Sequence, residues 1–193
     1  CHGTSHARDS ARQRAGMAEE SLLAQTLSTL ITDFNQRGIQ YALAGGWAYS
    51  ALVEPRATTD IDVLLLLEQP SPDRLQSLLS SLFDSTIVHP AAMVFHGISI
   101  WRCVGIRQAR EVVIDFLLAD SEFLRTVLTR RRVVAFGAIQ IPIVTLEDLI
   151  VLKTIAGRLQ DQADLEKIEE RQGDLGIDWD YVRFWKRTLG LIR

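Results

Sequence analysis

The sequence predicts an α/β (α+β) fold, in which a small mixed β-sheet is flanked by helices and followed by a mainly helical C-terminal part. Three observations lead to this prediction. Short apolar runs typical of strands alternate with amphipathic segments of helical spacing over residues 18–118. The later strand-like runs are separated by hairpin-length gaps, which favours antiparallel pairing beside the first two strands. After Thr145 the apolar residues recur at helical spacing.

Length and composition divide the chain into three expected parts. The opening residues contain no initiator Met and precede Met17, so we expect residues 1–16 to be a leader or expression-derived segment without structure. The sheet-bearing core is expected at residues 17–120, and the mainly helical part at residues 121–193. A chain of 193 residues with 47% hydrophobic content can bury a stable core of this kind.

The first elements lead to a pair of glycines. Apolar residues at helical spacing predict a helix over Ala18–Gln36. An apolar strand at Tyr41–Ala44 follows and breaks at Gly45-Gly46, because glycine readily adopts the backbone conformations of tight turns. The helix-compatible segment WAYSALVE then leads to a strand that begins at Asp60.

The remaining elements follow from the same two periodicities. Alternating or continuous apolar runs bounded by turn residues predict strands, and apolar residues three and four apart predict helices. Thr145 followed by Asp148 is similar to a capping box, so a helix is expected to start after Thr145. Before it, we expect a helix at Asp73–Phe83, strands at Thr86–His89, Met93–Phe95, Ile98–Val104 and Glu111–Leu118, a helix at Ser121–Thr129, and a hairpin at Val133–Ile143 that turns at Gly137.

Composition narrows the classes of function. A net charge of −3 and a pI near 5.8 are not typical of a nucleic-acid-binding domain, and Arg130–Arg132 with nearby Arg125 is the only dense basic cluster. The longest apolar runs are far shorter than the ~20 residues of a membrane-spanning helix, so no membrane partner is expected. Cys1 and Cys103 are too few for a disulfide framework, which fits a reducing cytoplasm.

Two acidic residues open a strand that is apolar on both faces. Asp60 and Asp62 are two residues apart, so their carboxylates lie on the same face of the strand and close together. Like charges repel at this spacing, whereas Mg²⁺ binds one or two protein carboxylates and completes its shell with phosphate and water oxygens. Gly45-Gly46, at the start of a helix, offers backbone N–H groups to an anion. A solvated strand end or a helix cap is the alternative for the acids, and a simple turn for the glycines.

A third acid lies inside another apolar run. Asp115 is in the middle of EVVIDFLL, where an ionised carboxylate is costly unless it is paired or binds a metal. A structural salt bridge is the alternative to a metal site. In combination, these motifs resemble those of the polymerase-beta-like nucleotidyltransferase superfamily at Ala44-Gly45-Gly46, Asp60-Ile61-Asp62-Val63 and Ile114-Asp115-Phe116.

A lysine lies in line with the apolar face of the expected C-terminal helix. The charged head of Lys153 needs an anionic partner at this place. Either the stem packs and the ammonium group reaches water, or the ammonium group contacts the triphosphate of a bound nucleotide. Asp161 and Asp164 follow, and capping of the next helix is a simpler role for Asp161.

This region is similar to the C-terminal helices of the AbiEii/AbiGii-type toxin nucleotidyltransferases. In that family a lysine-bearing helix precedes an arginine and an Asp-x-x-Asp-Leu element, as in TLEDLIVLKTIAGRLQDQADLEKI. The resemblance extends in pieces over Tyr41–Glu169 and implies that Lys153, Asp161 and Asp164 support nucleotide binding. Gly46 stands where many relatives have serine, and the chain is shorter than typical toxin members, which leaves the acceptor open.

The resemblance implies Mg²⁺-dependent transfer of a nucleoside monophosphate from an NTP to an acceptor hydroxyl. Asp60, Asp62 and Asp115 would be the catalytic residues and would hold two Mg²⁺ ions, with Asp115 accepting the proton. Gly45 and Gly46 would bind the phosphates through their backbone N–H groups.

Three kinds of function remain open for such a site. A toxin-type enzyme would modify tRNA and have an antitoxin protein as a partner. An antibiotic nucleotidyltransferase would modify a small molecule; Gly-Gly-Trp followed by Asp-Ile-Asp also occurs in such enzymes, and the acidic chain favours a small acceptor. A catalytically silent antitoxin or regulatory nucleotide-binding protein is the third alternative, against which the presence of all three carboxylates argues. We expect a cytoplasmic protein in each case.

Overall fold

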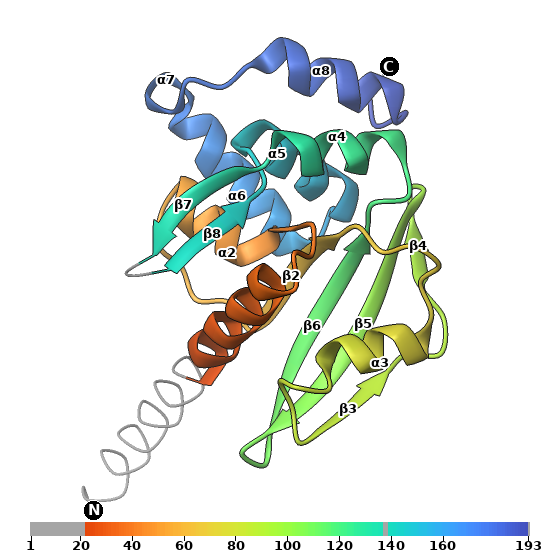
Figure 1. Ribbon diagram of the computed structural model, residues 1–193. Coiled ribbons are helices and arrows are strands. Elements are labelled where there is room, and N and C mark those ends of the chain that lie inside the picture. The colour runs from red at the N-terminus through yellow and green to blue at the C-terminus, as the bar shows by residue number, and fades with distance from the viewer. Residues whose placement is uncertain (1–21, 137–138, 193) are drawn as a thin grey trace, which may run out of the picture.

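A mixed β-sheet forms the middle layer of the protein, whose computed structural model describes residues 22–136 and 139–192 (Figure 1). Its strand order is β3-β5-β6-β2-β1-β8-β7, and β4 pairs with β5 outside this path. Pairing is parallel between β2 and β6 and between β1 and β8, and antiparallel between the other neighbours. The strands are β1 (Tyr41–Leu43), β2 (Asp60–Leu65), β3 (Ser85–Val88), β4 (Met93–Phe95), β5 (Ile98–Arg107), β6 (Arg110–Leu118), β7 (Arg132–Phe136) and β8 (Ile139–Ile143).

Helices cover both faces of this sheet. The helix at residues 22–36 and α3 lie on the near face in Figure 1 and pack on alternate residues of the central strands, such as Ile61 and Phe116. Helices α2, α4, α5 and α8 pack on the opposite face, against Leu64 and Leu117. The helices after residue 40 are α2 (Gly45–Leu52), α3 (Pro72–Leu79), α4 (Glu122–Arg130), α5 (Leu146–Ala156), α6 (Leu159–Glu170), α7 (Gln172–Leu175) and α8 (Trp179–Thr188).

The predicted α/β fold is thus confirmed, with β2 near the centre of the sheet as its apolar sequence indicates. The sheet is larger than expected, because the β7-β8 hairpin extends it through the parallel pairing of Leu43 with Ile143. The expected leader at residues 1–16 and the expected turn at Gly137 lie outside the described residues. No helix within the described ranges combines the length and hydropathy needed to cross a membrane.

Two helix boundaries differ from the prediction for local reasons. The predicted helix at Asp73–Phe83 ends at Leu79, where the Ser80 hydroxyl donates to the carbonyl of Ser77 and competes with the helical backbone. The glycine pair, expected as a turn before a helix, forms the first two residues of α2. The start of α5 agrees with the prediction, since the Thr145 hydroxyl accepts a hydrogen bond from the Asp148 amide.

Candidate active site

Three carboxylates from two neighbouring strands converge on the sheet face that carries α2 and α5. Asp62 on β2 is directly opposite Asp115 on β6 in the parallel register, and Asp60 is on the same face of β2. Carboxylate oxygens of Asp60, Asp62 and Asp115 all lie within 4.8 Å of one another. Asp62 and Asp115 are buried, with relative exposures of 9% and 5%. The structure thus brings together the three acids that the sequence predicted as one site.

The electrostatics of this triad favour a cation. Burial, reinforced by the carboxylates of Asp60 and Asp115, raises the pKa of Asp62 to about 7, against the opposing effect of Arg158 and Lys153. A divalent ion removes this penalty, because hard carboxylate oxygens are the ligands that Mg²⁺ prefers. The donor set and its spacing therefore fit a divalent metal.

Asp115 has a cationic partner that was not anticipated from the sequence. Arg102 lies opposite it on β5, and its guanidinium forms a two-pronged ion pair, with Nε to Oδ1 at 2.8 Å and Nη2 to Oδ2 at 2.6 Å. The salt bridge considered as the alternative for Asp115 is therefore present alongside the triad. A charged residue within ISIWRCVGIR, an otherwise mainly apolar strand, was the available indication.

The glycine pair makes room for two side chains of the site. A Cβ atom on Gly45 would lie 1.7 Å from Oδ2 of Asp62, and Gly45 also has a positive φ of 54°. A Cβ atom on Gly46 would lie 2.6 Å from the Thr58 hydroxyl oxygen. Both positions require glycine because side-chain atoms of the protein approach them closely. The sequence predicts another role for these glycines, the binding of phosphate through their backbone N–H groups.

We expect Gly45→Ala to destabilise the protein more than the matched variant Gly176→Ala. Gly176 has a similar φ of 61° and no atom within 4 Å of an added Cβ, so its substitution reports the backbone strain alone, roughly 1–2 kcal/mol. Gly45→Ala adds the collision with Asp62, about 1–3 kcal/mol more for overpacking. Urea unfolding of both variants measures the difference. Equal losses would show that Asp62 moves away from position 45 without cost.

Two further residues hold the start of β2 in place. The indole Nε1 of Trp47 donates to the backbone carbonyl of Asp60 at 3.2 Å, and the Thr58 hydroxyl donates to Oδ1 of Asp60 at 3.2 Å. The Ala44 amide donates to the carbonyl of Asp62 at 2.9 Å. These bonds tie α2, the loop after it and the end of β1 to the strand that carries the acids.

A second charged group lies where α5 meets α6, and we call Arg56, Lys153, Arg158, Asp161 and Asp164 the α5–α6 charge cluster. Lys153 Nζ contacts Oδ1 of Asp161 at 3.1 Å and Oδ2 of Asp164 at 2.5 Å. Arg158 Nε bonds Asp161 at 2.7 Å, and Arg56 Nη2 bonds Asp164 at 3.0 Å. Burial by itself would raise the pKa of Asp161. The hydrogen bond from Arg158 and the charges of Lys153 and Arg158 outweigh burial, so the pKa of Asp161 is lowered.

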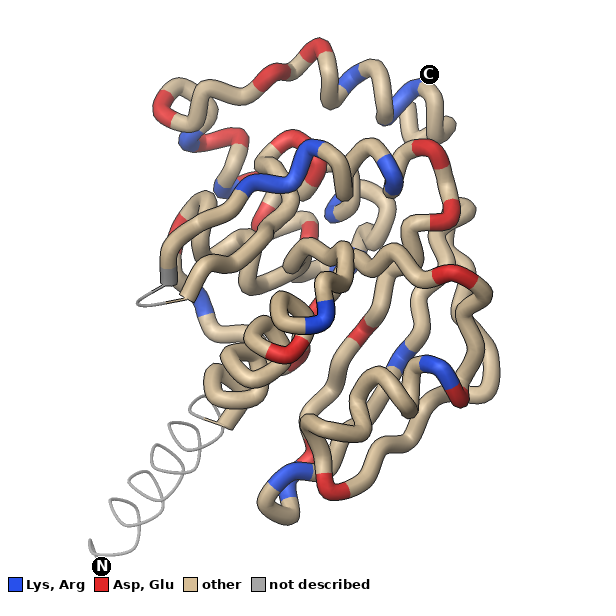
Figure 2. The backbone as a smooth tube through the Cα atoms, in the orientation of Figure 1, with Lys and Arg blue, Asp and Glu red and all other residues tan. Residues whose placement is uncertain are grey.

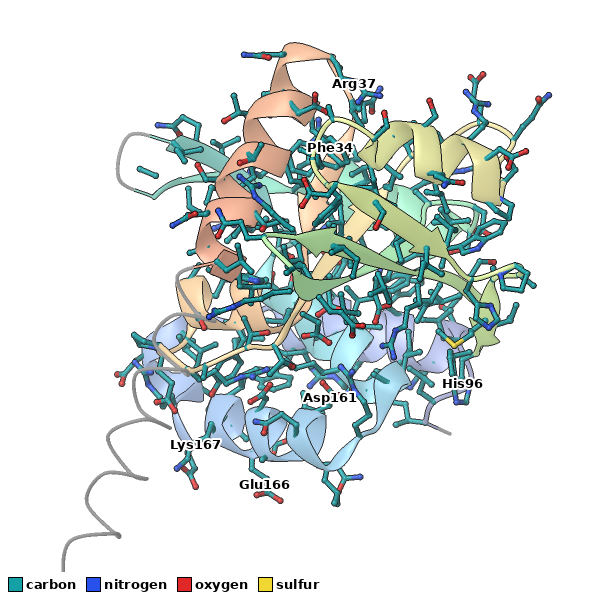
Figure 3. The ribbon with its side chains drawn as sticks, turned by 90° about the horizontal axis from the view of Figure 1, so that it is seen from below. Phe34, Arg37, His96, Asp161, Glu166 and Lys167 are labelled. Atoms are coloured by element: carbon teal, nitrogen blue, oxygen red, sulfur yellow. The ribbon has the colours of Figure 1, made fainter. Side chains whose placement is uncertain are left out.

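These contacts identify the partner of Lys153. Its side chain is 3% exposed, so the ammonium group is buried between two aspartates and does not reach water as in the snorkelling alternative. In Figure 3 Asp161 points from α6 into the protein, whereas Glu166 and Lys167 point outward from the same helix. Asp161 also accepts from the Arg158 amide at 3.3 Å, which is the capping contact considered from the sequence.

A single cavity of about 310 Å³ connects the two charged groups. The predicted site residues Gly45, Asp62, Asp115, Lys153 and Asp161 line it. Asp60, Gly46 and Asp164 do not line this cavity, although Asp60 is close to Asp62 and Asp115, and Asp164 contacts Lys153. Arg102 and Arg158 complete its charged part, and neither was named as a site residue from the sequence.

Solved nucleotidyltransferase structures share this fold at low sequence identity. An antigenic nucleotidyltransferase-like protein from Paracoccidioides brasiliensis is 19% identical, with a TM-score of 0.54 and coverage of 78% of this chain and 75% of its own. A putative nucleotidyltransferase from Thermotoga maritima is 14% identical, with a TM-score of 0.51 and coverage of 77% and 92%. ANT(2″)-Ia, solved in complex with adenylyl-2″-tobramycin, is 12% identical, with a TM-score of 0.57 and coverage of 86% and 99%.

Sequence families give a more specific assignment. Comparison with curated proteins gives no match. Residues 24–188 match the family described as nucleotidyl transferase of unknown function, DUF2204, and this range contains the triad, α2 and the α5–α6 charge cluster. The chain therefore belongs to the DUF2204 family, the nucleotidyl transferases of unknown function.

Proposed function

We propose that the protein transfers a nucleoside monophosphate from an NTP to an acceptor hydroxyl in a Mg²⁺-dependent reaction. The observation that carries the proposal is the convergence of Asp60, Asp62 and Asp115 in a buried site beside the N-terminus of α2. Nucleotidyltransferase family membership supports the reaction type, and the repulsion among the carboxylates supports the metal.

The three aspartates would hold the metal, and Asp115 would also act on the acceptor. Bound Mg²⁺ would offset charge on the triphosphate and favour ionisation of the acceptor hydroxyl. The Asp115 carboxylate, which belongs to the triad and lines the cavity, would accept the hydroxyl proton. Its two-pronged ion pair with Arg102 fixes the orientation of this carboxylate before substrate binds.

The nucleotide would bind between α2 and α5. The backbone N–H groups of Gly45 and Gly46 begin α2, where unpaired amides and the helix dipole favour phosphate. Lys153 and Arg158 bring positive charge to the same cavity. Asp161 and Asp164 would contribute through Lys153, by holding its ammonium group in position, and we propose no direct contact between them and the phosphates.

A test of the role of Lys153 must separate binding from folding. Lys153→Met takes the shared cation from Asp161 and Asp164, which keep Arg158 and Arg56 as partners, so we expect a loss of about 1–3 kcal/mol in the free energy of unfolding. Combining it with Asp161→Asn and Asp164→Asn removes the excess buried negative charge and should recover part of this loss. The combined variant should still bind Mg·NTP at least ~10-fold more weakly than the parent in calorimetry, since a cation near the phosphates is gone. Parent-like affinity would assign Lys153 a purely structural role.

Two kinds of acceptor are candidates for this reaction. The likeness to AbiEii/AbiGii-type enzymes supports tRNA as the acceptor and an antitoxin as a partner. Part of the basic cluster at Arg130–Arg132 is not free to bind RNA, because Arg130 pairs with Glu147 and Asp148 and stacks on Tyr181. In Figure 2 basic and acidic positions are intermixed around the blue stretch where α4 meets β7. The cavity of about 310 Å³ favours the second candidate, a cytoplasmic enzyme that modifies a small molecule.

Binding and turnover measured together test the proposal. Calorimetry with each of the four NTPs, with and without Mg²⁺, should give metal-dependent binding of at least one. Pyrophosphate release with that NTP should then require an acceptor, supplied as total tRNA or as a mixture of hydroxyl-bearing small molecules. Metal-dependent binding without transfer to any acceptor would support the silent regulatory or antitoxin alternative, and absence of NTP binding would contradict the proposal.

A further inference from the structure

The sheet face that carries the triad becomes apolar beyond Asp115. Along β6 and β5, Leu117 lies two residues from Asp115 on the same face, and Ile100 lies two residues from Arg102 and directly opposite Leu117. On β4, Met93 pairs with Ile100 and Phe95 with Ile98. We call Met93, Phe95, Ile98, Ile100 and Leu117 the apolar wall, and all five line the cavity that contains Asp62 and Asp115.

The apolar wall is on the far side of the triad from the proposed phosphate site. Across the sheet these strands follow in the order β1, β2, β6, β5, β4. Gly45 comes just after β1, Asp62 is on β2 and Asp115 is on β6. The apolar wall begins on β6 and continues over β5 and β4. A triphosphate held at the start of α2 therefore leaves the wall free for a second molecule. That molecule would approach the α-phosphorus from the Asp115 side.

The wall is open to such a ligand. Phe95 is 50% exposed although it lines the cavity, and α5 contributes the apolar side chains of Leu152 and Ile155 from the opposite side. The cavity volume of about 310 Å³ lies at the lower end of small-molecule sites. Covering an exposed aromatic ring in such a site contributes directly to affinity, because apolar surface leaves water.

The charges around the wall exclude a polycationic acceptor. Asp115 is paired with Arg102, and Asp161 with Lys153 and Arg158, so these acids already have cationic partners. Asp62, the remaining cavity carboxylate, belongs to the proposed metal site. An acceptor with several ammonium groups would thus meet arginines and apolar side chains in place of free carboxylates, and its desolvation would be uncompensated.

We propose that the acceptor is an uncharged, mainly apolar aromatic molecule with a hydroxyl group, bound on the apolar wall with that hydroxyl at Asp115. This inference rests on the proposed nucleotidyl transfer. The hydroxyl oxygen forms a bond to the α-phosphorus of the NTP, its proton passes to the Asp115 carboxylate, and the bond from the α-phosphorus to the bridging oxygen breaks. Pyrophosphate leaves with that electron pair.

The test uses 4-methylumbelliferone and 1-naphthol as aromatic hydroxyl probes and tobramycin as a polycationic probe. Binding of each is measured by calorimetry on the full chain loaded with Mg²⁺ and the non-reactive α,β-methylene analogue of the NTP that binds. Transfer is then followed as pyrophosphate release with the NTP itself. We expect binding and transfer with at least one aromatic probe and neither with tobramycin.

Neighbouring residues of β4 provide a matched pair of variants. Phe95→Ala removes an aromatic ring from the wall, whereas Val94→Ala changes the adjacent residue, which is 67% exposed and does not line the cavity. We expect Phe95→Ala to raise the KM for the aromatic probe at least ~10-fold and Val94→Ala to leave it unchanged.

Three results would overturn the inference while NTP binding persists. In the first, neither aromatic probe binds. In the second, the protein prefers tobramycin to the aromatic probes. In the third, Phe95→Ala loses affinity for Mg·NTP and the KM for the aromatic probe does not change. The last would show that the wall holds the nucleobase. Loss of metal-dependent NTP binding in the parent contradicts the proposed function itself, so the two failures are distinguishable.

Discussion

Asp62→Asn is expected to lower the affinity for Mg·NTP by at least ~100-fold. The substitution removes a charged oxygen from the centre of the triad, and loss of one partner from a buried charge pair costs about 3 kcal/mol or more. Isothermal calorimetry with Mg·NTP on parent and variant measures the effect. The exposed α6 variant Glu166→Gln removes one negative charge far from the triad and should bind like the parent. Unchanged affinity in Asp62→Asn would remove this carboxylate from the metal site.

The same variant should be more stable than the parent when metal is absent. Burial and the neighbouring acids raise the pKa of Asp62 from 3.8 to about 7, so the folded state disfavours its ionised form. The free energy of unfolding of the metal-free parent therefore decreases as the pH rises from about 4 through about 7, the interval between the unfolded and folded pKa values. Asparagine removes this contribution, with a gain on the order of 1–4 kcal/mol at pH 8.

Urea unfolding in EDTA at pH 5 and pH 8 tests the predicted direction of this change in the free energy of unfolding. The advantage of Asp62→Asn should be larger at pH 8 than at pH 5. Added Mg²⁺ should stabilise the parent more than the variant, because only the parent has the complete set of ligands. A variant that is less stable than the parent at pH 8 in EDTA would show that the triad is not repulsive without metal.

Asp115→Asn is expected to reduce turnover by at least ~10²-fold while changing Mg·NTP affinity much less. General-base assistance contributes about 10²–10⁴-fold to a rate, and it acts on the acceptor proton in the transition state. Asp60 and Asp62, with the start of α2, would still hold the nucleotide. Pyrophosphate release measured beside NTP calorimetry separates the two effects. Undiminished turnover would exclude Asp115 from the mechanism.

Arg102→Gln provides the control for the ion pair. It removes the same salt bridge as Asp115→Asn but keeps the carboxylate of Asp115. The Arg102 side chain is 47% exposed, so we expect its loss to be tolerated in folding. If Arg102→Gln lowered turnover as much as Asp115→Asn, loss of the salt bridge alone would account for the effect of Asp115→Asn.

The sequence by itself determined the fold class and the grouping of the acids. Apolar periodicity is a local property, and it predicted β4 at Met93–Phe95 and the start of α5 as the structure has them. The spacing of Asp60 and Asp62 places them on one face of any strand, because side chains alternate. The apolar run around Asp115 predicted a strand with a buried carboxylate, and the motif resemblance assigned it to the same site.

Only the tertiary structure decided which charges meet and what surrounds them. Arg102 faces Asp115 because β5 and β6 pair in one register, and a slip of one residue would turn either side chain to the other face. Lys153 is paired with Asp161 and Asp164 because α6 folds back on α5 after Gly157, which has a positive φ of 63°. The apolar wall next to the triad combines residues of three strands, and apolar side chains of α5 line the same cavity. Such contacts depend on strand register and helix packing between distant segments, which local sequence patterns do not specify.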